Sequence, residues 1–193
     1  MSKKTDTPEA SAYFNRAYRA PITFWGDTRI PEELKGLVAT YNPKTSLELG
    51  CGLGRLSRFI AGQGITATGV DFSSVAIEKA KKRVANDERQ PTFILGDVTN
   101  LETINEQFDV SFDVGCFHVL DEEGQRKYAS EVYRLLKPGA THLIWAMDHS
   151  PIGFKLNHDY IAKVFETRFR LEQSKFSRRR IVASHWYWLV RLE

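Results

Sequence analysis

The sequence predicts an α/β fold in which strands alternate with helices, and three observations support that prediction. From Ser46 onward, short apolar segments with strand character alternate with segments of helical spacing. A glycine-rich segment, Gly50–Gly54, follows the first of these strands and opens a helix. Hydrophobic residues make up 42% of the 193 residues and charged residues 26%, which is typical of a globular domain with its own core. Such alternation favours parallel βαβ units with right-handed crossovers.

Two helices are predicted ahead of the first strand. The first nine residues are polar, and we expect them to be frayed. Aromatic residues at near-helical spacing predict a helix over Ala10–Arg19, which Pro21 ends. Pro31 is a favourable first-turn residue and predicts a second helix that runs to about Tyr41, where Asn42–Pro43 stop it.

The alternating part then continues to the end of the chain. Strands are predicted over Ser46–Gly50, Ile65–Asp71, Pro91–Gly96, Phe108–Val114 and Ala140–Met147. Helices are predicted over Leu53–Ala61, Ser74–Arg83, Asp121–Lys137 and Asn157–Glu166. The last two strands, Phe169–Ser177 and Ala183–Leu192, are expected to form a hairpin at the sheet edge. No internal repeat or linker is visible, so we expect a single domain over residues 1–193.

Charge and cysteine content disfavour several classes of protein. Lys and Arg number 27 against 24 Asp and Glu, and a net charge of +3 gives no electrostatic case for nucleic acid. The basic cluster of Lys175 and Arg178–Arg180 is interpreted as a solvated turn, with a site for an anionic partner as the alternative. No long apolar run and no apolar signal region are present, so we expect neither membrane insertion nor secretion. Cys51 and Cys116 cannot form a disulfide framework, which favours a cytoplasmic protein.

The strongest functional signal is the segment Gly50-Cys-Gly52-Leu-Gly54. Glycines let the backbone turn sharply and let a ligand approach the main chain, and the helix start adds unpaired N–H donors. In an open α/β sheet, ligands lie outside the carboxyl ends of the strands, which is where this loop falls. The spacing GxGxG differs from the GxGxxG of dinucleotide enzymes and from the P-loop pattern, so it implies no nucleoside triphosphate.

Acidic residues end the strands that follow this loop. Asp71 ends the second strand, where a carboxylate can accept both hydroxyls of a ribose. Asp97 ends the third strand and can accept a hydrogen bond from the exocyclic amine of adenine. Phe72 and Val98 follow these two acids and are placed to sandwich the adenine ring.

With Glu48 inside the first strand and Asp113 at the end of the fourth, these motifs resemble, in order, those of the class I S-adenosylmethionine-dependent methyltransferase family. The resemblance covers about residues 30–147 and includes Arg134–Ala140 before the fifth strand. It implies a Rossmann-like, doubly wound sheet of seven strands in the order 3-2-1-4-5-7-6, with strand 7 antiparallel, and S-adenosyl-L-methionine as cofactor. The cofactor-binding residues that we expect are Trp25, Glu48, Gly50, Cys51, Gly52, Gly54, Asp71, Phe72, Asp97, Val98, Asp113 and Val114.

The N-terminal segment indicates which group within this family the chain resembles. Tyr18–Leu34, with Trp25-Gly-Asp27, is loosely similar to the lid of small-molecule methyltransferases related to thiopurine, thiol and tellurite methyltransferases. In this chain Gly26 separates the tryptophan from the aspartate. The similarity implies a helical lid over residues 1–30 and a core over residues 31–193. It also implies a small-molecule acceptor, with sulfur or another soft nucleophile favoured over oxygen or nitrogen. The sequence leaves open whether the protein is a monomer or a homodimer.

A sulfonium methyl group is already activated, so catalysis depends mainly on holding the reactants in line. An acceptor that carries a proton also needs a base, and His118 is the candidate, with a surface or helix-start histidine as the alternative. Cys116 is interpreted as a packing residue. The other four histidines lack the spacing of metal ligands, so no metal site is predicted. Two other functions stay open: a noncatalytic S-adenosylmethionine-binding module, and an RNA or protein methyltransferase that uses Arg178–Arg180.

Overall fold

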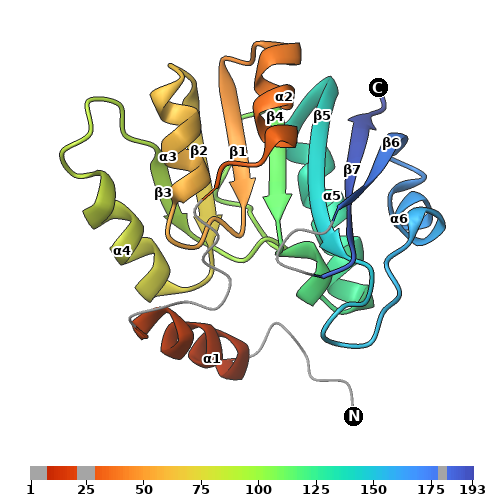
Figure 1. Ribbon diagram of the computed structural model, residues 1–193, viewed down its shortest axis with the longest axis horizontal. Helices are drawn as coiled ribbons and strands as arrows, with labels where there is room; N and C mark the ends of the chain where they lie inside the picture. Colours follow the sequence, from red (N-terminus) through yellow and green to blue (C-terminus); the bar gives the residue numbers. More distant parts are fainter. Residues whose placement is uncertain (1–7, 21–28, 178–181) are drawn as a thin grey trace.

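One sheet forms the centre of the computed structural model, which describes residues 8–20, 29–177 and 182–193. Its strands are β1 (Thr45–Leu49), β2 (Thr66–Asp71), β3 (Thr92–Leu95), β4 (Phe108–Val114), β5 (Leu136–Met147), β6 (Phe169–Ser177) and β7 (Ser184–Arg191). The seven strands are ordered β3-β2-β1-β4-β5-β7-β6, and β7 runs antiparallel to both of its neighbours (Figure 1). This confirms the α/β class and the strand order that the resemblance implied.

Helices cover both faces of the sheet. They are α1 (Pro8–Arg19), α2 (Glu32–Tyr41), α3 (Arg55–Gly62), α4 (Ser74–Val84), the 3-10 helix η1 (Phe117–Val119), α5 (Glu122–Leu135) and α6 (His158–Phe165). On one face, Leu37 of α2 and Ile60 of α3 are buried in a cluster with Trp145 and Trp186. Across the described ranges, none of the helices has the length and hydrophobicity that crossing a bilayer requires.

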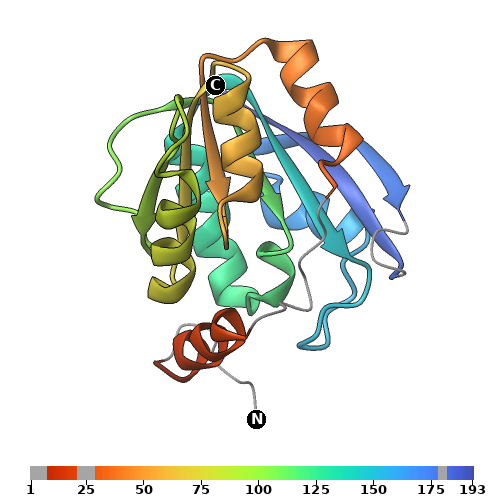
Figure 2. The same ribbon diagram turned by 60° about the vertical axis from the view of Figure 1, so that its left-hand side comes forward.

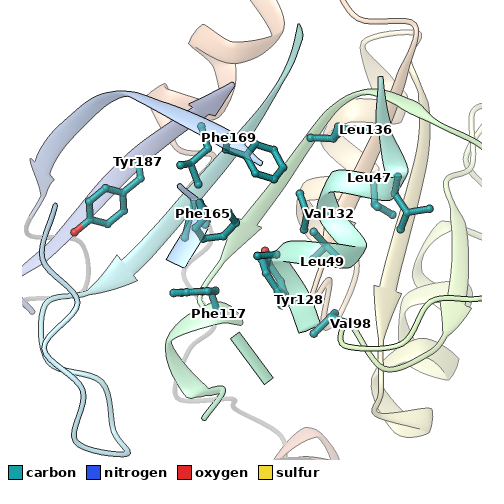
Figure 3. Packing of buried hydrophobic residues seen from close by; sticks show 14 of the residues in the cluster. Leu47, Leu49, Val98, Phe117, Tyr128, Val132, Leu136, Phe165, Phe169 and Tyr187 are labelled. Carbon is teal, nitrogen blue, oxygen red and sulfur yellow. The ribbon is translucent and has the colours of Figure 1, made fainter. Parts of the chain in front are cut away.

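The larger core lies on the opposite face, under α5 and α6 (Figure 3). Val132 of α5 and Phe165 of α6 belong to the same buried cluster as Leu47 and Leu49 of β1. Successive side chains of a strand point to opposite faces, so Glu48, between these two leucines, points toward α3. Fully burying an apolar side chain of this size contributes roughly 1.5–3 kcal/mol. This packing holds β1, which leads into the glycine-rich loop, firmly in the sheet.

The junction between α5 and β5 differs from the prediction. α5 ends at Leu135, and β5 begins at Leu136 rather than at Ala140. Leu136 is already extended and pairs with Phe108 of β4, and the register shifts before Val110. The Pro-Gly pair is therefore an irregularity inside the strand, because burial of Leu136 against β4 ends the helix earlier than the pair would.

The carboxyl ends of the parallel strands share one edge, and α1 lies across it. β1 pairs in parallel with β2 and β4, and the arrows of β1, β4 and β5 point toward α1 (Figures 1 and 2). The Ser73 hydroxyl donates to Asn15 Oδ1 of α1 at 2.7 Å, and the Lys79 ammonium donates to the Tyr18 carbonyl at 2.6 Å. α1 is thus docked on the loop and helix that follow β2.

Candidate functional site

The glycine-rich loop uses backbone conformations that favour glycine. Gly50, Gly52 and Gly54 have φ of +71°, +52° and +73°, in the left-handed region. A Cβ on Gly50 would lie 2.5 Å from Cβ of Cys116, and one on Gly54 would lie 2.3 Å from Cζ of Phe93. The loop after β1 therefore lies against the loop after β4 on one side and against β3 on the other.

Asp71 ties the glycine-rich loop to the loop after β2. Its Oδ2 accepts the Gly52 N–H and its Oδ1 accepts the Ser73 N–H, both at 2.8 Å. Burial raises the pKa of this carboxyl, and the two N–H donors oppose that shift. Each carboxylate oxygen accepts more than one hydrogen bond, so Asp71 keeps acceptor capacity for the hydroxyls of a ribose.

Asp97 and Phe72 lie farther along the same edge. Asp97 Oδ1 accepts both the N–H and the hydroxyl of Thr99 at 2.8 Å, and its Oδ2 accepts no hydrogen bond from the residues described. Val98 beside it is buried. The ring of Phe72 meets that of Phe14 in α1 edge-on, with centroids 5.3 Å apart. One carboxylate oxygen is therefore open to an amine donor, next to apolar side chains.

Glu48 fixes the start of α3 beneath the glycine-rich loop. Its Oε2 accepts the N–H of Ser57 at 2.8 Å and also the Ser57 hydroxyl. Burial raises the pKa of this carboxyl from 4.5 to about 8, although the two bonds from Ser57 lower it. Glu48 is therefore largely neutral in the folded protein at neutral pH.

We expect Glu48→Gln to reduce the pH dependence of stability. Because folding raises the pKa of Glu48 from 4.5 to about 8, the neutral carboxyl stabilises the fold fully below the lower value, and this contribution is lost as the pH rises through the higher one. Glutamine keeps an oxygen for Ser57 but loses no proton. Between about pH 5 and about pH 8, the urea-unfolding free energy of the wild type should fall more than that of the variant. Glu78→Gln, on the exposed face of α4, is the control, and equal falls in all three proteins would contradict the assignment.

Asp113 holds the loop that follows β4. Its Oδ1 accepts the Cys116 N–H at 2.7 Å, and its Oδ2 accepts the Phe117 N–H at 2.7 Å and the Tyr128 hydroxyl at 2.9 Å. Burial raises the pKa of this carboxyl to about 6, and these hydrogen bonds oppose the shift. The Tyr128 oxygen lies 3.0 Å from Nε2 of the buried His142. Asp113 thus anchors the loop after β4, which lies against Gly50 of the glycine-rich loop through Cys116.

The other predicted residues surround that loop. His118 is buried in η1, where its Nδ1 accepts the Met147 N–H at 3.4 Å and its ring meets Trp145 edge-on. Val114 is partly buried against the cluster that contains Trp145. Cys51 is buried, which raises the pKa of its thiol well above the ordinary value.

The structure brings the glycine-rich loop, the three strand-end acids and His118 to one sheet edge. Trp25 and Arg178–Arg180 lie outside the described residues. Tyr18 of α1, which the sequence analysis places in the lid, reaches the glycine-rich loop, because a Cβ on Gly52 would lie 2.7 Å from the Tyr18 hydroxyl. In the described part of the chain, no three His, Cys, Asp or Glu side chains are grouped to hold a metal.

Comparison with known proteins shows similarity to methyltransferases. Residues 47–139 match the methyltransferase domain family. The 2-heptyl-1-hydroxyquinolin-4(1H)-one methyltransferase of Mycobacteroides abscessus is 30% identical over 105 residues, which are 53% of this chain and 45% of that protein. The chain spans about half the length of the first curated relatives that it matches.

Solved structures share the fold over nearly the whole chain. The 1,6-didemethyltoxoflavin-N1-methyltransferase of Burkholderia thailandensis, with bound 1,6-didemethyltoxoflavin and S-adenosylhomocysteine, superposes with a TM-score of 0.81 at 17% identity, covering 100% of this chain and 94% of that one. A TehB-like S-adenosylmethionine-dependent methyltransferase from Corynebacterium glutamicum gives a TM-score of 0.72 at 20% identity, covering 96% and 100%. At these identities the likeness shows the fold alone.

Proposed function

We propose that this chain, whose residues 47–139 match the methyltransferase domain family, is a class I S-adenosylmethionine-dependent methyltransferase that transfers the methyl group of S-adenosylmethionine to a small molecule. The observation that carries the proposal is the convergence of Gly50–Gly54, Asp71 and Asp97 at one sheet edge. Asp71 would accept the ribose hydroxyls and Asp97 Oδ2 the adenine amine. The S-adenosylhomocysteine bound in the structurally similar 1,6-didemethyltoxoflavin-N1-methyltransferase supports the same cofactor.

For the acceptor we propose a thiol or another soft nucleophile. The bound cofactor supplies an activated sulfonium methyl, so the protein must chiefly hold the nucleophile in line and exclude water. The loop after β4 lies against Gly50 through Cys116, which places residues 115–118 and the end of β5 beside the cofactor loop. His118 is the acceptor-side residue there, and Trp25 remains the proposed aromatic residue of the lid.

Thermal unfolding with S-adenosylmethionine and with S-adenosylhomocysteine tests the cofactor. Ligand at 100 times its Kd should stabilise the fold by about 2.7 kcal/mol, which for a chain of this size raises Tm by roughly 5–10 °C. NAD, whose fingerprint the loop lacks, is the control ligand and should leave Tm unchanged. The proposal would be overturned if the protein is folded but neither S-adenosylmethionine nor S-adenosylhomocysteine raises its Tm.

Transfer of a labelled methyl group to thiols, halides and chalcogen oxyanions tests the acceptor. We expect transfer to thiols. Cofactor binding without transfer to any acceptor would favour the noncatalytic module instead. Salt-dependent binding of RNA would favour an RNA methyltransferase.

A further inference from the structure

The carboxyl end of β5 and the adjacent amino end of β7 carry an Asp–His pair that the proposed function has not used. Asp148 follows β5 directly, and His185 lies in β7, paired with Ala146 of β5. The pair is therefore at the same sheet edge as Asp71 and Asp113. Asp148 is also next to Met147, whose N–H is held by His118. This places the pair beside the proposed acceptor side of the site.

The pair is held from several directions yet is accessible. His185 Nδ1 and Asp148 Oδ1 are 2.6 Å apart, and the two side chains are 29% and 25% exposed. The backbone of Asp148 donates to the Ala183 carbonyl at 3.0 Å and accepts the Leu156 N–H at 2.9 Å. The imidazole stacks on Tyr187, with centroids 5.8 Å apart, and meets the exposed Phe176 edge-on at 5.3 Å. The orientation of the ring is therefore fixed.

Hydrogen bonding gives the two histidines at this edge opposite tautomers. His118 Nδ1 accepts an N–H, so the neutral ring carries its proton on Nε2, which is then a donor. His185 Nδ1 faces a carboxylate, so the neutral ring carries its proton on Nδ1. Its Nε2 makes no hydrogen bond within the described ranges and keeps a lone pair. A base oriented by a carboxylate in this way can take a proton from a nucleophile.

We propose that His185 is the general base for the methyl acceptor and that Asp148 is its positioning residue; this rests on the proposed thiol acceptor. As the acceptor sulfur forms its bond to the methyl carbon, the bond between that carbon and the sulfonium sulfur breaks. The bonding pair stays on the cofactor sulfur, giving S-adenosylhomocysteine. The thiol proton passes to Nε2 of His185, and the resulting imidazolium releases it to solvent.

Two thiols of different acidity test this assignment. Mercaptoethanol is mostly protonated at neutral pH and needs a base, whereas para-nitrothiophenol is already ionised and does not. With the full chain, His185→Gln should lower kcat/KM for mercaptoethanol about 100-fold and leave that for para-nitrothiophenol nearly unchanged. Asp148→Asn should show the same selectivity with a smaller loss. His158→Gln, at the exposed start of α6, is the matched control, and calorimetry should show unchanged S-adenosylhomocysteine affinity in all three variants.

A loss of equal size for both thiols, or no loss for mercaptoethanol, would overturn the proposal. Nitrogen-15 NMR of the imidazoles tests the base assignment even if no thiol is methylated. A lack of thiol methylation would by itself overturn only the thiol acceptor. The base assignment is supported if the neutral His185 ring carries its proton on Nδ1 in the wild type and becomes a mixture of both tautomers in Asp148→Asn. A proton on Nε2 of His185 in the wild type would overturn it.

Discussion

Replacing Asp71 with alanine is expected to weaken S-adenosylhomocysteine binding by about 100-fold or more. The variant loses the proposed acceptor for the ribose hydroxyls and leaves the N–H groups of Gly52 and Ser73 without their Asp71 partner. A hydrogen bond to a charged group contributes about 1.5–3 kcal/mol, and two such losses correspond to a factor of about 100 or more. Isothermal titration calorimetry measures the affinity directly.

Two further variants show whether the effect belongs to the carboxylate. Asp71→Asn keeps the shape but turns an amide NH2 toward one of the backbone donors, so its loss should be nearly as large. Glu78→Ala removes an acid from the exposed face of α4 and should bind as the wild type does. Unchanged affinity in Asp71→Ala would remove Asp71 from the cofactor site.

Replacing Asp113 with alanine is expected to destabilise the fold by about 3–5 kcal/mol, because three donors in the interior lose one acceptor. These donors are the N–H groups of Cys116 and Phe117 and the hydroxyl of Tyr128. Figure 3 shows the side chain of Tyr128 within the buried cluster. Guanidinium unfolding followed by far-UV circular dichroism measures the loss. Tyr128→Phe removes only one of the three bonds and should cost about 1–2 kcal/mol.

Unfolding Asp113→Ala and Tyr128→Phe under the same conditions compares the unfolding free energy that each variant loses. A loss below about 1 kcal/mol in Asp113→Ala would mean that water replaces the carboxylate. A greater loss in Tyr128→Phe than in Asp113→Ala would show that the link from Tyr128 to His142 matters more than the loop anchor.

The sequence was sufficient to predict features that depend on neighbouring residues. The GxGxG spacing and the acids at strand ends predicted that the glycine-rich loop and these acids lie together at one edge of the sheet. Parallel strands with short crossovers bring their carboxyl ends to the same edge. The aspartate pair Asp71 and Asp97 could be found in this way. The start of β5 was misplaced, because pairing of Leu136 with Phe108 is a tertiary contact that outweighs the local signal of the Pro-Gly pair.

Contacts between distant segments left little trace in the sequence. Asp148 and His185 are 37 residues apart and meet only because β7 returns antiparallel beside β5. The partners of Asp113 could not be predicted either, since Tyr128 resembles any other apolar-face residue of its helix until the packing of α5 against β4 is known. Periodicity shows which face of an element is buried but not which polar atom lies opposite it.

The docking of α1 has a kinetic consequence. This 12-residue helix lies outside the sheet. Its residues Asn15, Phe14 and Tyr18 hold it against the loops next to Asp71 and Gly52. Segments with few buried contacts open at lower free energy than the core does. We expect a nucleoside seated beneath α1 to leave no faster than the helix lifts. The residence time of the spent cofactor, and with it the upper limit of turnover, would then depend on the N-terminal helix, far along the chain from the proposed acceptor side.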